Sequence, residues 1–105
     1  MKLNIKKDVL NEKLNIVSKA ISSKNIIPVL SGIKMDLKNE GLFLTASNDE
    51  IAIETFIDSN NIVSIDEIGS IVVPGKYFLE IIRKIEDETV YIETDGLNTL
   101  ITTKR

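Results

Sequence analysis

Apolar and polar residues follow the same order of patterns twice along this chain of 105 residues. Each copy begins with a short apolar segment, continues with apolar residues at helical spacing, and ends in stretches where apolar and polar residues alternate. The first copy predicts a strand, a helix opening at Asp8 and three further strands, at residues 2–6, 9–22, 29–37, 42–47 and 51–57. The second copy predicts a strand at 70–73, a helix opening at Pro74, and strands at 90–94 and 99–103. The sequence therefore predicts a duplicated β-α-β-β-β unit in which the last strand of the second copy is missing.

The length and the repeats predict one domain, with a first repeat at about residues 1–58 and a second at about 70–105. The segment that links them contains a further candidate strand at residues 62–65. Turn residues separate the alternating stretches and indicate hairpins, at Asn39-Glu40-Gly41, Asn48-Asp49 and Asp95-Gly96. We therefore expect the α+β class, with two helices packed on one face of a single continuous, mostly antiparallel sheet. The helical face is the expected working surface.

The first predicted helix has one apolar side for packing on the sheet. Asp8 is the expected N-cap, because its carboxylate can accept hydrogen bonds from the free amides of the first turn. At 100° per residue, an apolar stripe is formed by Leu10, Leu14, Val17 and Ile21, widened by Val9, Ile16 and Ala20. Lys13 falls inside this stripe, so we expect its ammonium group to extend to the edge. Lys19 falls on the opposite, exposed arc.

The second predicted helix has Pro74 at its first position, where the missing N–H costs no hydrogen bond. Its predicted buried stripe consists of Tyr77, Phe78, Ile81, Ile82 and Ile85. Lys76 and Arg83 are seven residues apart, which places them about 20° apart around the axis and about 10.5 Å apart along it. Two cations therefore share one exposed face, with Glu80 and Lys84 nearby.

Composition excludes several kinds of chemistry. The chain has no cysteine and no histidine, which excludes disulfides, thiolate zinc sites, cysteine nucleophiles and histidine acid/base catalysis. The first residues lack the apolar segment of a signal peptide, and no run approaches the roughly 20 apolar residues that span a bilayer. We expect a cytoplasmic protein without a cofactor.

The net charge of −3 is distributed unevenly along the chain. Residues 1–38 carry a net +5, residues 39–75 carry −7, and residues 76–105 carry −1. The first helix and its flanks are therefore basic, whereas the middle of the chain is acidic. One surface could attract phosphate although the whole molecule does not, while ordinary solubilising charge is the alternative explanation.

Two candidate functional motifs are rejected on their spacing and composition. The segment from Gly69 to Lys76 resembles a phosphate-binding loop, but five residues separate its glycines, Tyr77 replaces the required Ser or Thr, and its Ile-Val-Val core predicts a strand. The carboxylate runs Asp49-Glu50 and Glu86-Asp87-Glu88 lack EF-hand spacing and a partner base or nucleophile. We interpret both runs as solvated turns and expect no metal or catalytic residue.

Several segments in order along the chain carry a family resemblance, namely Ser18, Ser22 and residues 27–33, 41–49 and 71–78. Together they resemble the first domain of the bacterial sliding clamp, the beta subunit of DNA polymerase III, over the whole chain. The resemblance implies a DNA-clamp fold in which each domain contains the repeated unit twice. It also implies a head-to-tail homodimeric ring of three domains per subunit, with helices lining a hole around duplex DNA and sheets forming the outer wall.

By the same resemblance, this chain is expected to be a first domain cut short, because the family has one more strand in this domain and two further domains. Ring closure and the family's main pocket for polymerase and clamp-loader peptides are then not expected in this polypeptide alone. The residues that match basic DNA-contacting positions are Lys24, in the loop after the first helix, Lys76 and Arg83. Lys19 matches less securely. All four would contact phosphates, which carry no sequence information.

The resemblance implies a non-catalytic DNA replication processivity factor with duplex DNA, DNA polymerase III, the clamp loader and a second clamp subunit as partners. An alternative from another class is a small α+β protein-interaction or ligand-binding module without DNA contact. A carboxylate-based hydrolase is a further alternative, which would require the acidic residues at 49–50 and 86–88 to converge in a pocket. The placement of charge separates these hypotheses.

Overall fold

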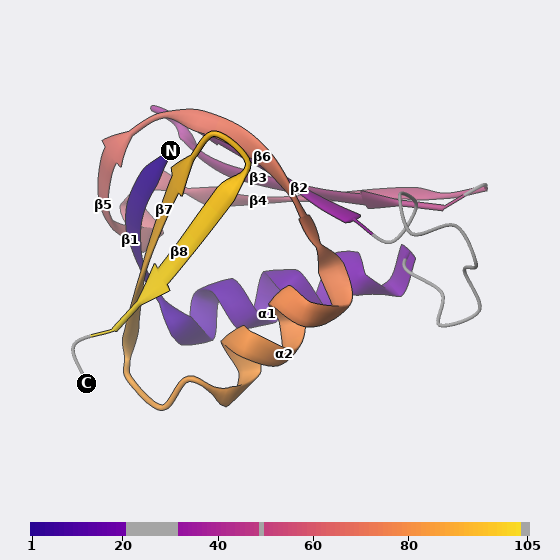
Figure 1. The fold of residues 1–105 in the computed structure, drawn as a ribbon. Helices are drawn as coiled ribbons and strands as arrows, with labels where there is room; N and C mark the ends of the chain where they lie inside the picture. Colours follow the sequence, from indigo (N-terminus) through magenta and orange to yellow (C-terminus); the bar gives the residue numbers. More distant parts are fainter. Residues whose placement is uncertain (21–31, 49, 104–105) are drawn as a thin grey trace.

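The computed structural model describes residues 1–20, 32–48 and 50–103. The first part of the chain forms β1 (Lys2–Lys6), α1 (Lys7–Val17), the short 3₁₀ helix η1 (Ser18–Ala20), β2 (Gly32–Lys38), β3 (Gly41–Ser47) and β4 (Ala52–Asp58). The second part forms the 3₁₀ helix η3 (Ser59–Asn61), β5 (Ile62–Glu67), β6 (Gly69–Pro74), α2 (Gly75–Lys84), β7 (Thr89–Asp95) and β8 (Asn98–Thr102). The predicted α+β class and order of elements are confirmed (Figure 1).

The strands form two antiparallel sheets of four strands each, so the prediction of one continuous sheet was wrong. One sheet has the order β5-β1-β7-β8 and the other the order β4-β3-β2-β6. Only Ile68 separates β5 from β6, so one nearly continuous segment runs from the edge of the first sheet to the edge of the second (Figure 1). Gly69 lies at this passage, where a Cβ atom would be 3.2 Å from the Met1 nitrogen.

The two copies of the repeat exchange their first strands. In the first copy, β1 leaves its own strands and pairs with β7 of the second copy, with Ile5 opposite Val90. In the second copy, β6 pairs with β2 of the first, with Ile33 opposite Val73. Each sheet is therefore built from both copies, which joins the two halves of the chain into one core.

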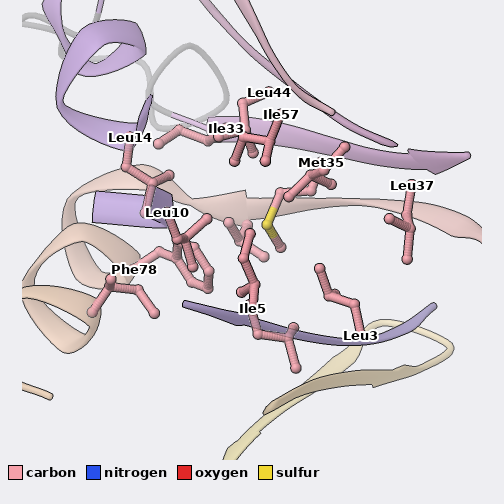
Figure 2. Close-up of a cluster of buried hydrophobic side chains, with 14 of the residues drawn as sticks. Leu3, Ile5, Leu10, Leu14, Ile33, Met35, Leu37, Leu44, Ile57 and Phe78 are labelled. Atoms are coloured by element: carbon pink, nitrogen blue, oxygen red, sulfur yellow. The ribbon is translucent and has the colours of Figure 1, made fainter. Parts of the chain in front are cut away.

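The two helices lie side by side on the same side of the sheets, as predicted, and α1 contacts α2, β3 and β4 (Figure 1). From α1, Leu10 and Leu14 point into a cluster with Ile33, Leu44 and Ile57, and Phe78 joins it from α2 (Figure 2). Every charged side chain in the described parts of the chain lies at least partly exposed. Burial of apolar surface therefore holds the helices against the strands.

The start of α1 differs from the prediction. Its N-cap is Lys6, which makes no side-chain cap hydrogen bond, and the helix begins at Lys7 directly after β1. Asp8 is therefore not the N-cap but lies in the first turn, where its negative charge still interacts favourably with the helix dipole. The predicted buried residues Leu10, Leu14 and Val17 are confirmed, and Ile21 lies outside the described residues.

The start and the buried side of α2 also differ. Pro74 is the N-cap and the last residue of β6, so the first helical residue is Gly75. Phe78 and Ile82 are buried as predicted, and Ile85 is partly buried. Tyr77 and Ile81, which were expected in the buried stripe, are 69% and 47% exposed. The reason is that only one side of this helix is covered, so the stripe is narrower than the apolar sequence suggests.

The linking strand and the predicted antiparallel pairings of β2 with β3, β3 with β4 and β7 with β8 are confirmed. Asp49, in the predicted turn Asn48-Asp49, lies outside the described residues. Asn39 and Glu40 connect β2 to β3, and Gly96 and Leu97 connect β7 to β8. The candidate strand at residues 62–65 is β5, which extends to Glu67.

Candidate nucleic-acid interface

The exposed side of α2 carries three cations. Lys76 and Arg83 are both exposed, as the sequence predicted, and Lys84 is exposed in the last turn. Phe78 and Ile82 on the opposite side are buried in the core, which fixes the rotation of the helix about its axis. Since Lys76 and Arg83 are separated by two turns, their side chains start from points about 10.5 Å apart along the helix.

The neighbouring helical segment contributes a further exposed cation. Lys19 lies in η1, which continues from the end of α1, and its side chain is exposed. Lys13 is half-buried within α1, consistent with a stem that packs along the apolar side. Lys24, the remaining predicted DNA-contacting residue, lies outside the described residues. The structure thus places three of the four predicted residues on exposed helical positions.

Charge is partitioned between helices and strands. The segments Lys7–Ala20 and Gly75–Lys84 contain six cations and three carboxylates, a net charge of +3. The rest of the sequence contains seven cations and thirteen carboxylates, a net charge of −6. The helical layer is therefore electropositive relative to the remainder, which focuses attraction for an anionic ligand on one side of the molecule.

The ion pairs between described residues all lie on the sheets. The N-terminal ammonium group of Met1 is 3.6 Å from Glu67, and Lys2 Nζ is 3.8 Å from Glu67 and 3.5 Å from Glu93. Lys38 pairs with Asp36 at 3.8 Å. Within the described ranges the helix cations pair with no carboxylate, so their charge is available to an external anion.

The pKa shifts reflect the acidic character of the β5-β1-β7-β8 sheet. The carboxylate of Glu93, with that of Glu67, raises the pKa of the Lys2 ammonium group above its ordinary value. Partial desolvation and the carboxylate of Asp66 raise the pKa of Tyr91, whose hydroxyl lies 3.4 Å from that carboxylate. The shift of Lys2 and part of the shift of Tyr91 arise from negative charge on this sheet, which would repel phosphate.

Two residues on the helical side were missed as candidates. Lys84 was noted beside Arg83 but not assigned a role, although the helical angle alone would have found it. Tyr77 was assigned to the core because it is aromatic and adjacent to Phe78. Only the observed packing of α2 shows that Tyr77 faces outward.

The acidic runs do not form a catalytic or metal site in the described part of the chain. Glu86 and Glu88 are exposed, and no group of three or more carboxylates among the described residues is arranged to hold a metal ion. Asp49 lies outside the described residues. The convergence of carboxylates that a hydrolase would require is not observed among the described residues.

No described helix has both the length and the apolar character needed to cross a membrane.

Comparisons with known proteins identify the class of this domain. The family description "DNA polymerase III beta subunit, N-terminal domain" matches residues 1–105. A Staphylococcus aureus protein named "Beta sliding clamp" is 42% identical over 107 aligned positions, covering 97% of this chain and 28% of that protein. The chain belongs to the DNA polymerase III beta subunit family, of which it matches the N-terminal domain.

Solved structures agree with this assignment. The DNA polymerase sliding clamp of Bacillus subtilis superposes with a TM-score of 0.92 at 39% identity, covering 100% of this chain and 29% of that one. The beta clamp of Helicobacter pylori, solved bound to a DNA ligase peptide, superposes with a TM-score of 0.89 at 28% identity, covering 100% and 28%. The chain thus spans less than a third of the length of these relatives.

Proposed function

We propose that this domain supplies part of the DNA-facing surface of a sliding clamp that makes DNA replication processive. In this proposal Lys76, Arg83, Lys19 and Lys24 contact phosphates of duplex DNA without reading its sequence. The observation that carries the proposal is the partition of charge, with helix cations that pair with no carboxylate among the described residues and an excess of carboxylates in the rest of the sequence. The alternative of an interaction module without DNA contact gives no reason for this partition.

The proposed mechanism requires no catalysis by this domain. Non-specific electrostatic binding to duplex DNA is weak, with dissociation constants of roughly 10⁻⁴ to 10⁻⁶ M at physiological salt. An open protein would therefore leave DNA quickly, whereas a closed ring stays linked to the duplex and can slide while the weak contacts exchange. A polymerase attached to such a ring gains a high effective concentration at the primer end.

The whole clamp would need more than this domain. We infer a head-to-tail homodimeric ring, with DNA polymerase III and the clamp loader as partners, acting in the cytoplasm. The family membership supports these inferences, while the ring and the partner pocket would depend on the domains that this chain does not span. The 105-residue chain, as a single domain, is expected to bind DNA only through phosphate contacts.

The proposal is tested by the salt dependence of binding to a fluorescent 20-base-pair duplex, measured by anisotropy. With at most four phosphate contacts, the slope of log K against log salt should be no steeper than about −3.6. Lys76→Ala and Arg83→Ala should each make the slope shallower by about 0.9, and the double variant by about 1.8.

Lys34→Ala is the matched control, because Lys34 is exposed on the face of β2 that points away from the core. It should leave the slope unchanged, and circular dichroism should show the same fold for all variants. Equal loss in Lys34→Ala would indicate diffuse charge attraction instead of a defined surface. An unchanged slope in the double variant would reject the assignment of Lys76 and Arg83.

A further inference from the structure

Tyr77 is an exposed aromatic residue in the first turn of α2, directly after Lys76. Its side chain is 69% exposed, and its hydroxyl group has no hydrogen-bond partner among the described residues. The second tyrosine of the chain, Tyr91, differs on both points, since it is half-buried and its hydroxyl lies 3.4 Å from Asp66. Tyr77 thus holds a free hydrogen-bond donor on the helical side of the molecule.

The helical geometry places Tyr77 on the exposed side of α2, at the edge of its cationic face. Gly75, Phe78 and Ile82 are the buried residues of α2 and define the direction toward the core. Relative to the opposite, outward direction, Tyr77 lies at about 45° on one side and Lys76 at about 55° on the other, with Glu80 between them. Tyr77 and Lys84 are seven residues apart, so they form a line about 10.5 Å long that runs parallel to the line from Lys76 to Arg83.

The charge of this face indicates which kind of group would accept a hydrogen bond from the Tyr77 hydroxyl. A phenol donates one hydrogen bond, and Lys76 and Lys84, which precede and follow Tyr77 along the helix, attract ligands that carry negatively charged oxygen atoms. Tyrosine side chains are among the groups that bind DNA phosphates in known complexes. We propose that the Tyr77 hydroxyl donates a hydrogen bond to a phosphate oxygen of duplex DNA bound across α2. This inference rests on the proposed function and adds to it a contact that carries no charge.

An uncharged contact has a measurable signature that differs from that of the lysines. Neutralisation of a phosphate by Lys76 releases a counterion and contributes to the salt slope, whereas a phenol hydroxyl releases none. Removal of the hydroxyl should therefore weaken binding by the same factor at every salt concentration. For a hydrogen bond to a charged acceptor such as phosphate this factor is about 12- to 150-fold.

The experiment compares Tyr77→Phe with wild type and with Tyr91→Phe in the same duplex-binding assay on the 105-residue chain. Tyr77→Phe should bind about 12- to 150-fold more weakly with an unchanged slope, and Tyr91→Phe should bind as wild type does. Incorporation of 3-fluorotyrosine gives one ¹⁹F signal for each of the two tyrosines, and Tyr77→Phe assigns them. Addition of duplex should shift the Tyr77 signal and leave the Tyr91 signal in place.

The possible failures can be told apart. If Tyr77→Phe binds as wild type while Lys76→Ala still flattens the slope, the hydroxyl contact is wrong and the proposed function stands. If Tyr77→Ala weakens binding and Tyr77→Phe does not, the ring contacts the ligand and the hydroxyl proposal is overturned. If wild-type binding shows no salt dependence, the proposed function fails, and the phosphate contact fails with it.

Discussion

Gly41 shows how one residue can determine the local shape of a sheet. It opens β3 with a φ of +151°, a value that residues with side chains rarely adopt. A Cβ atom there would collide with the carbonyl oxygen of Ile57 and lie 2.8 Å from the ring of Phe56. That ring packs against Phe43 with centroids 4.7 Å apart, and Lys38 Nζ lies 5.2 Å from the centroid of Phe43. The glycine therefore makes room for an aromatic pair on the outer side of the sheet.

We expect Gly41→Ala to lower the free energy of unfolding by at least about 2 kcal/mol, because it adds a collision to backbone strain. Gly96→Ala is the matched control, since Gly96 also has a positive φ, +61°, but a Cβ atom there meets nothing within 4 Å. Gly96→Ala should lower the free energy of unfolding by only about 1 kcal/mol, because it adds only the strain of the left-handed conformation. Urea denaturation of both variants measures the difference, and equal losses would show that the backbone at Ile57 and the ring of Phe56 both shift to relieve the collision.

The residue scale also shows which site residues could be predicted. The exposed positions of Lys76 and Arg83 were predicted because a cation on an apolar helix has to face solvent, whereas the family resemblance implied that these residues contact DNA. Tyr77 could not be placed in the same way, since an aromatic residue is compatible with either the core or the surface. The approach of Phe56 to Gly41 was equally hidden, because it depends on the pairing of β3 with β4 and not on the local sequence.

The helix α2 offers a direct comparison of two neighbouring isoleucines. Ile82 is fully buried in the core, while Ile81 is 47% exposed. Ile82→Ala should therefore lower the free energy of unfolding by about 2–5 kcal/mol, because it leaves a cavity against the strands. Ile81→Ala should cost less than about 1 kcal/mol, since water can fill the space.

Thermal and urea unfolding of the two variants measures this comparison. Identical side chains in adjacent positions of one helix cancel the contribution of helix propensity to first order. Comparable losses in both variants would mean that a further surface covers Ile81, in contradiction to its exposure in the described structure.

At the scale of elements, the sequence predicted the type and order of every described α-helix and β-strand, but not the 3₁₀ helix η3 or how each α-helix is covered. Alternation and helical spacing are local properties, so they determine where elements occur. The width of a buried stripe depends on the neighbours, and α2 has neighbours on only one side. The N-cap of α1 was misplaced for a related reason, since β1 runs directly into the helix and leaves no room for a capping turn before Asp8.

At the scale of the whole molecule, the duplication and the antiparallel pairing could be predicted, but the division into two sheets could not. Exchange of the first strands leaves the pattern of each strand unchanged, because β1 needs one apolar face in either sheet. The uneven charge was visible in the sequence, and the fold gathers it into a helical side of +3 and a remainder of −6.

Because β1 and β6 each pair with strands of the other copy, neither half of the polypeptide contains a complete core. A chain of residues 1–59 would lack both neighbours of β1, and a chain of residues 60–105 would lack the neighbour of β6. We expect each half alone to give the circular dichroism spectrum of an unfolded peptide, and an equimolar mixture to regain native secondary structure with a concentration-dependent melting temperature. If either half folded autonomously, the two copies would be separate modules. If neither half folds alone, the two copies of the unit can fold only together, because each sheet contains strands of both copies.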